Sequence, residues 1–130
     1  MKRILVIDDN PLNNKVYTDP LDKKYRVDIV MSLIAVKRKL QINEYDLLVI
    51  DIMMPTQKYG GDNEIITGFY FYTHTLKERY PNTPILFWSN LPSETFEDYF
   101  QIEKPHNVFF IQKTKENYNH LLEKVNQLLE

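Results

Sequence analysis

Short apolar segments recur along the chain, and polar or amphipathic segments separate them. The apolar segments are rich in β-branched and aromatic residues and are too short for whole amphipathic helices. Continuous runs of this kind are typical of strands buried on both faces of a parallel sheet. The expected strands are residues 2–7, 25–30, 46–51, 84–88 and 107–112.

The segments between these runs have the spacing of amphipathic helices. Apolar residues three and four positions apart gather on one face, as Phe96, Tyr99 and Phe100 do. The helices are expected to open at Asn10-Pro11, Ser32, Gly68 and Ser93, and the last is expected over Tyr118 to Leu129. Their inward-facing residues include Val36, Leu40, Phe69, Tyr72 and Leu76.

Pro20 falls inside the first expected helix. Proline lacks the backbone N–H that a helix interior uses, and it disfavours helical geometry at the residue before it. We therefore expect this helix to break or kink near Thr18-Asp19, with Pro20 restarting a turn.

Five strands that alternate with five helices, without a repeat or linker, predict a single α/β domain over residues 1–130. The expected architecture is a doubly wound, five-stranded parallel sheet with five helices. In such a sheet, ligands bind beyond the carboxyl ends of the strands. Residues directly after the strands are therefore the first candidates for a functional site.

Charged residues follow three of the expected strands. Asp8 and Asp9 follow the first, Asp51 the third, and Lys113 the fifth. Three carboxylates and one ammonium group at one edge of a sheet predict a site for a divalent cation and an anionic group. A helix cap explains one of the first two carboxylates, and a turn or a solvated strand end explains Asp51 or Lys113 alone. None of these explains the whole set.

The order of these motifs resembles the receiver domain of two-component response regulators. An Asp pair, the run Asp51 to Pro55 (DIMMP), the hydroxyl of Ser89 and Lys113 each end a different strand. The resemblance covers essentially the whole chain. It implies the flavodoxin-like receiver topology and a phosphoprotein that binds Mg²⁺.

The resemblance also implies a role for each site residue. Asp51 would be the phosphoacceptor and would bind Mg²⁺ together with Asp9 and the backbone carbonyl of Met53. Asp8 would act mainly through a metal-bound water. The Ser89 hydroxyl would hydrogen-bond one phosphoryl oxygen, and Lys113 would pair with another.

A conformational switch is implied as well. On phosphorylation, the Ser89 hydroxyl would be drawn inward and the Phe110 ring would change rotamer. The face formed by the fourth helix, fifth strand and fifth helix would then carry the signal. Its candidate exposed aromatic side chains are Tyr99, Phe109 and Tyr118.

Several features depart from the family pattern. Residues 56–67 look like an insertion beside the acceptor, which is either a lid or a tolerated surface loop. Thr114 stands where proline is common, and Asn90 where a small residue is usual. Met53 and Leu91 are apolar at positions that tune hydrolysis, so neither can readily orient an attacking water. We expect slow self-dephosphorylation.

The composition narrows the class of protein. With Cys 0, the chain has neither a disulfide framework nor a thiolate metal site. The net charge of −2 gives no sign of the excess positive charge that binding to nucleic acid requires. No apolar run is long enough to cross a bilayer, and the opening run is interrupted at Asp8, so neither membrane insertion nor a signal peptide is expected. We expect a cytoplasmic protein.

The expected function is that of a phosphoacceptor receiver domain, either complete or part of a larger regulator. Its donor would be a sensor histidine kinase or a phosphotransfer protein, and its target an unknown downstream protein or a second copy in a homodimer. It would be no enzyme beyond its own phosphorylation and dephosphorylation.

Two other functions are weighed against this one. A phosphorylation-independent interaction module is the main alternative, supported by the insertion, Asn90 and Thr114. A phosphatase with an aspartyl intermediate is disfavoured because Met53, not an acid-base aspartate, stands two residues after Asp51.

Overall fold

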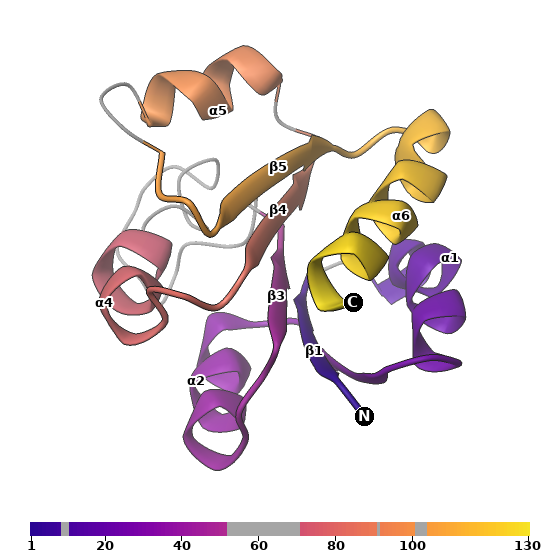
Figure 1. Ribbon diagram of the computed structural model, residues 1–130, viewed down its shortest axis with the longest axis horizontal. Helices are drawn as coiled ribbons and strands as arrows, with labels where there is room; N and C mark the ends of the chain where they lie inside the picture. Colours follow the sequence, from indigo (N-terminus) through magenta and orange to yellow (C-terminus); the bar gives the residue numbers. More distant parts are fainter. Residues whose placement is uncertain (9–10, 52–70, 91, 101–103) are drawn as a thin grey trace.

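The computed structural model describes residues 1–8, 11–51, 71–90, 92–100 and 104–130. Five parallel strands form one sheet in the order β2-β1-β3-β4-β5, so that β2 and β5 are its edges (Figure 1). The strands are β1 Arg3–Ile7, β2 Arg26–Val30, β3 Leu47–Ile50, β4 Ile85–Ser89 and β5 Val108–Gln112. All five expected strands are confirmed, with ends within one residue of those predicted.

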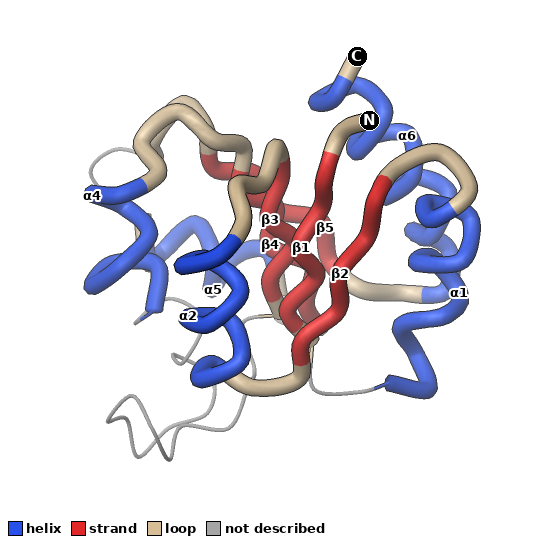
Figure 2. The backbone as a smooth tube through the Cα atoms, turned by 90° about the horizontal axis from the view of Figure 1, so that it is seen from below, coloured by secondary structure: helices blue, strands red, loops and turns tan. Residues whose placement is uncertain are grey.

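Helices cover both faces of this sheet. Figure 2 shows α1 and α6 on one face and α2, α4 and α5 on the other. The helices are α1 Pro11–Asp22, α2 Leu33–Ile42, α4 Lys77–Arg79, α5 Ser93–Tyr99 and α6 Tyr118–Leu129. A π-helical segment, Tyr72–Leu76, precedes α4, and a 3₁₀ turn, Lys115–Asn117, precedes α6. The predicted doubly wound α/β architecture is therefore confirmed.

The sheet separates two apolar clusters. Successive side chains of a strand point to opposite faces. Leu5 and Ile7 belong to the cluster beneath α2, α4 and α5, whereas Ile4 and Val6 belong to the cluster beneath α1 and α6. All four side chains are completely buried. Burial on both faces explains why the central strands β1 and β3 have continuous runs of apolar residues rather than alternating ones.

The first helix does not break as expected, and the alternative, a kink near Thr18-Asp19, stays a prediction. Helix α1 runs without interruption from Pro11 to Asp22 and contains Pro20 near its carboxyl end. A proline inside a helix costs about 3 kcal/mol. Tyr17 and Leu21 of the same helix are buried in the cluster beneath α1 and α6, and burying each is worth about 1.5–3 kcal/mol. Tertiary packing therefore outweighs the local preference.

Replacing Pro20 with alanine should stabilise the protein by about 1 kcal/mol. Alanine restores an N–H donor and favours the helix, while the more flexible unfolded chain offsets part of this gain. We expect a higher midpoint of urea unfolding. Val16→Ala, on the exposed part of α1, is the control. If the midpoint of urea unfolding were unchanged in Pro20→Ala, Pro20 would not lower the free energy of unfolding.

The N-termini of α2 and α5 test the expected helix caps, and one of the two expectations is confirmed. Ser32 is the N-cap of α2, as expected, and its hydroxyl oxygen accepts a hydrogen bond from the Ala35 N–H at 3.2 Å. Ser93 does not cap α5 as expected, because Pro92 is the N-cap and Ser93 is the first helical residue. The φ of −61° and ψ of 146° at Pro92 supply the extended geometry of an N-cap without a side-chain acceptor.

The helix expected over Gly68 to Arg79 is only partly described. From Phe71 to Arg79 the chain is helical, and Tyr72 and Leu76 are buried as predicted. Its middle is π-helical rather than α-helical, with the Lys77 N–H donating to the Tyr72 carbonyl. Gly68, Phe69 and the expected insertion 56–67 lie outside the described residues.

Candidate functional site

Backbone pairing brings the predicted strand ends together. The Asp51 N–H donates to the Ile7 carbonyl at 2.9 Å, which aligns the end of β3 with that of β1. The Lys113 N–H donates to the Ser89 carbonyl at 2.7 Å, which aligns the end of β5 with that of β4. Parallel strands place these ends on one edge of the sheet. Asp8, Asp51, Ser89 and Lys113 therefore lie along one edge of the sheet.

The Lys113 ammonium group joins two carboxylates at this edge. Its Nζ lies 2.7 Å from Oδ2 of Asp8 and 3.9 Å from Oδ2 of Asp51. The side chains of Asp8, Lys113 and Asp51 are 1%, 8% and 12% exposed, respectively. Two carboxylates against one ammonium group leave excess negative charge at a place that solvent hardly reaches. Such a site attracts a cation.

The donor set suits a hard divalent cation. Mg²⁺ prefers oxygen ligands and usually keeps several waters, so one or two carboxylates are enough to bind it. Asp8 and Asp51 supply such oxygens at one edge of the sheet. Asp9 and the Met53 carbonyl, the other expected ligands, lie outside the described residues. Among the described residues, no group of three His, Cys, Asp or Glu side chains that could hold a metal is found.

Ser89 lies between the strand that precedes Asp51 and the strand that precedes Lys113. It is the last residue of β4, which pairs with β3 on one side and β5 on the other. Its side chain is completely buried. A hydroxyl at this position is suited to hydrogen-bond a group held between Asp51 and Lys113.

Tyr17 is a site residue that the sequence did not reveal. Its hydroxyl donates to Oδ2 of Asp8 at 3.4 Å, and its ring is completely buried. Burial, and next the negative charges of Asp8 and Asp51, raise the pKa of Tyr17 well above its ordinary value. At a helical core position, a tyrosine looks like any other apolar residue. The one feature of the sequence that could have indicated its role is the hydroxyl itself, because a phenylalanine would pack equally well at position 17.

The predicted switch residue Phe110 contacts α5. Its ring stacks on that of Phe96, with centroids 4.5 Å apart and an interplanar angle of 16°. The contact joins β5 to the helix that was expected to carry the signal. Two residues expected on an exposed face are instead half-buried, because Tyr118 stacks on Tyr17 and Phe109 lies under the Lys124 ammonium group. The side chain of Tyr99, the third expected there, is not described.

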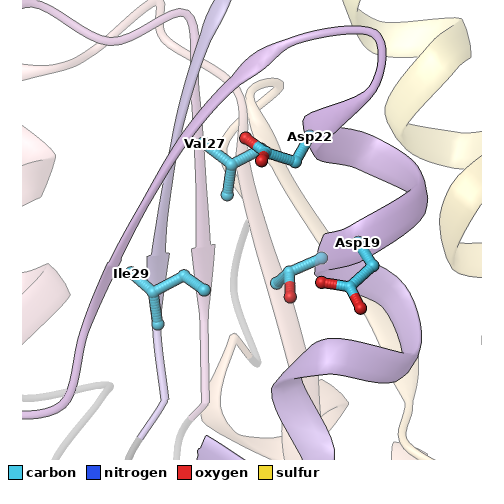
Figure 3. A pocket seen from close by; sticks show the side chains of 5 residues that line it. Asp19, Asp22, Val27 and Ile29 are labelled. Atoms are coloured by element: carbon cyan, nitrogen blue, oxygen red, sulfur yellow. The ribbon is translucent and has the colours of Figure 1, made fainter.

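A separate pocket lies between α1 and β2. Figure 3 shows Asp19 and Asp22 of α1 beside Val27 and Ile29 of β2, and Thr18 completes the lining. Its volume is about 90 Å³. None of the predicted site residues lines it, so it is distinct from the acidic edge of the sheet. In the described part of the chain, no helix has the length and apolar character to span a membrane.

Comparisons with known proteins agree with this geometry. The family model described as "Response regulator receiver domain" matches residues 4–126. A comparison with curated proteins finds no significant match.

Several solved structures share the fold. Chemotaxis protein CheY4 of Vibrio cholerae is 21% identical, with a TM-score of 0.73 over 99% of both chains. Response regulator protein TrrA of Thermotoga maritima, in complex with Mg²⁺-BeF, is 23% identical, with a TM-score of 0.68 over 99% of this chain and 100% of that one. A complex of histidine kinase ThkA with TrrA gives 22% identity and a TM-score of 0.69 over 100% of both chains.

These structures match the sheet order and helical layers described above, and the family match extends over nearly all of the sequence. The chain therefore belongs to the family of response regulator receiver domains of two-component systems.

Proposed function

We propose that this receiver domain accepts a phosphoryl group on Asp51 from a phosphohistidine. The observation that carries the proposal is the position of the Lys113 ammonium group between the Asp8 and Asp51 carboxylates. In the transfer, a carboxylate oxygen of Asp51 forms a bond to phosphorus while the phosphorus–nitrogen bond of the donor breaks. The leaving imidazole nitrogen keeps the electron pair and is protonated.

The described residues fit a magnesium ion, and Mg²⁺ binding is general in this family. We propose that Asp8, Asp9, Asp51 and the Met53 carbonyl hold it. When bound, Mg²⁺ neutralises negative charge around the incoming phosphoryl group. Phosphoryl transfer depends mainly on positioning and on this electrostatic stabilisation.

Lys113 changes partner in the proposed reaction. It now lies closer to Asp8 than to Asp51. A phosphoryl group on Asp51 brings new anionic oxygens, which favour movement of the ammonium group toward Asp51. The buried Ser89 hydroxyl would hydrogen-bond another of these oxygens, and the Phe110 ring would respond through its contact with Phe96.

The proposed donor is a sensor histidine kinase or a phosphotransfer protein, and the target is another protein. The complex of TrrA with a histidine kinase supports this kind of partner. The domain would act in the cytoplasm and would catalyse no reaction beyond its own phosphorylation and slow dephosphorylation.

The test is the intact mass of the protein after treatment with Mg²⁺ and acetyl phosphate. The wild-type mass should increase by one phosphoryl group, whereas that of Asp51→Asn should not change. Removing Mg²⁺ with EDTA should prevent most of the wild-type increase. An unchanged wild-type mass would overturn the proposal and support the alternative, an interaction module that works without phosphorylation.

A further inference from the structure

One oxygen of Asp8 receives two donors. Oδ2 lies 2.7 Å from Nζ of Lys113 and 3.4 Å from the hydroxyl of Tyr17. The Asp8 carboxylate is almost fully buried, at 1% exposure. A carboxylate oxygen held by donors from two different elements cannot rotate without losing both contacts. The pair therefore sets the orientation of Asp8.

The two donors differ in how freely they can move. Lys113 has a long, flexible side chain and a second carboxylate, Asp51, within reach at 3.9 Å. The Tyr17 ring is fixed, because it packs edge-on against Trp88, with centroids 5.9 Å apart, and stacks on Tyr118 at 6.5 Å. In the proposed reaction Lys113 turns toward the phosphoryl group. Tyr17 can keep its place on Asp8.

The charges of the two donors differ as well. A metal ion beside Asp8 repels the Lys113 ammonium group, whereas a neutral hydroxyl is compatible with that ion. A tyrosine hydroxyl carries its proton at neutral pH and can therefore donate to Asp8. Hydrogen bonds from outer residues to metal-binding carboxylates commonly orient those carboxylates.

We propose that Tyr17 is a positioning residue that holds Asp8 for Mg²⁺ binding and keeps it in place when Lys113 moves to the phosphoryl group. The inference rests on the proposed function. It adds a helix α1 residue to a site otherwise built from strand ends.

The test is the affinity for Mg²⁺ of the unphosphorylated 130-residue chain. Titration with Mg²⁺ can be followed by the fluorescence of Trp88, the only tryptophan in the sequence, which packs against Tyr17. Tyr17→Phe keeps the ring and removes the hydroxyl. We expect Mg²⁺ to bind this variant about three- to tenfold more weakly, at the low end of outer-residue effects because the contact is long. The urea midpoint without Mg²⁺ should change little.

Tyr118→Phe is the matched control. It removes the same group from the same aromatic cluster, and among the described residues Tyr118 makes no hydrogen bond to Asp8. Its affinity for Mg²⁺ should equal that of the wild type. In an Asp8→Asn background, Tyr17→Phe should change the affinity by less than about twofold, since the carboxylate on which Tyr17 acts is gone.

Each outcome decides the inference. An unchanged Mg²⁺ affinity in Tyr17→Phe would overturn the inference. So would a loss of Mg²⁺ affinity in Tyr118→Phe as large as that in Tyr17→Phe. The same holds if Tyr17→Phe weakened Mg²⁺ binding equally in the Asp8→Asn background. If the wild type itself bound no Mg²⁺, the metal site of the proposed function would fail together with this inference. If the wild type bound Mg²⁺ and Tyr17→Phe bound it equally well, only this inference would fail, and the proposed function would stand.

Discussion

Replacing Lys113 with methionine should slow phosphorylation of Asp51 by about 100-fold, a typical cost of removing one donor that stabilises developing negative charge. Methionine keeps much of the aliphatic side chain but removes the ammonium group that lies 2.7 Å from Asp8 and 3.9 Å from Asp51. The rate of mass increase with acetyl phosphate at saturating Mg²⁺ measures the effect. Full saturation is needed so that a change in metal affinity is not mistaken for a change in rate.

The same substitution should destabilise the metal-free protein by about 3 kcal/mol, because it leaves a buried carboxylate without its cation. Asp8 is 1% exposed and Lys113 8%, so solvent screens their interaction little. Added Mg²⁺ should restore part of the lost stability by supplying positive charge at the same place. Lys23→Met, at an exposed position, should change neither quantity. Wild-type stability in metal-free Lys113→Met would show that the ion pair does not stabilise the fold.

Replacing Trp88 with alanine should lower the free energy of unfolding by about 3–5 kcal/mol. The indole is 1% exposed and packs against Tyr17 and Tyr118, with centroids 5.9 Å and 5.6 Å away, so its removal leaves a cavity between the sheet, α1 and α6. Urea unfolding followed by circular dichroism avoids dependence on tryptophan fluorescence. Because the Tyr17 ring packs against Trp88, the variant should also weaken the hydrogen bond from the Tyr17 hydroxyl to Asp8.

Trp88→Phe separates the cavity from the polar group of the indole. Its Nε1 has no hydrogen-bond partner among the described residues, so phenylalanine removes an unsatisfied buried donor along with some volume. The cost should be about 1–2 kcal/mol. Equal losses for alanine and phenylalanine would contradict the cavity explanation, because phenylalanine fills most of the space.

The sequence predicted the part of the site that depends on strand direction. Asp8, Asp51 and Lys113 each end a continuous apolar run, and the carboxyl ends of parallel strands must share one edge of the sheet. No side-chain contact had to be known to bring them together. Ser89 followed from the same reasoning combined with the family resemblance. The chemical roles of these residues, and those of Asp9 and Met53, stay predictions.

Features that depend on packing between elements were not predicted. The capping and proline rules describe a few neighbouring residues, whereas α1 continues through Pro20 because Tyr17 and Leu21 are buried beneath it. No role was predicted for Tyr17, since helical periodicity does not show which polar group a tyrosine hydroxyl will contact. Tyr118 was expected on the surface, but it stacks on Tyr17. The uninterrupted α1 and the burial of Tyr118 both depend on contacts between distant parts of the chain.

The position of β2 at one edge of the sheet has a consequence for self-association. An edge strand offers backbone groups to which another chain can add, and charged side chains are a common defence against such aggregation. On β2, Arg26 is exposed, and the carboxylate of Asp28 is held in place by the Tyr45 hydroxyl at 2.6 Å. An incoming strand would have to lie along both charges. These charges therefore disfavour the addition of another chain at the β2 edge.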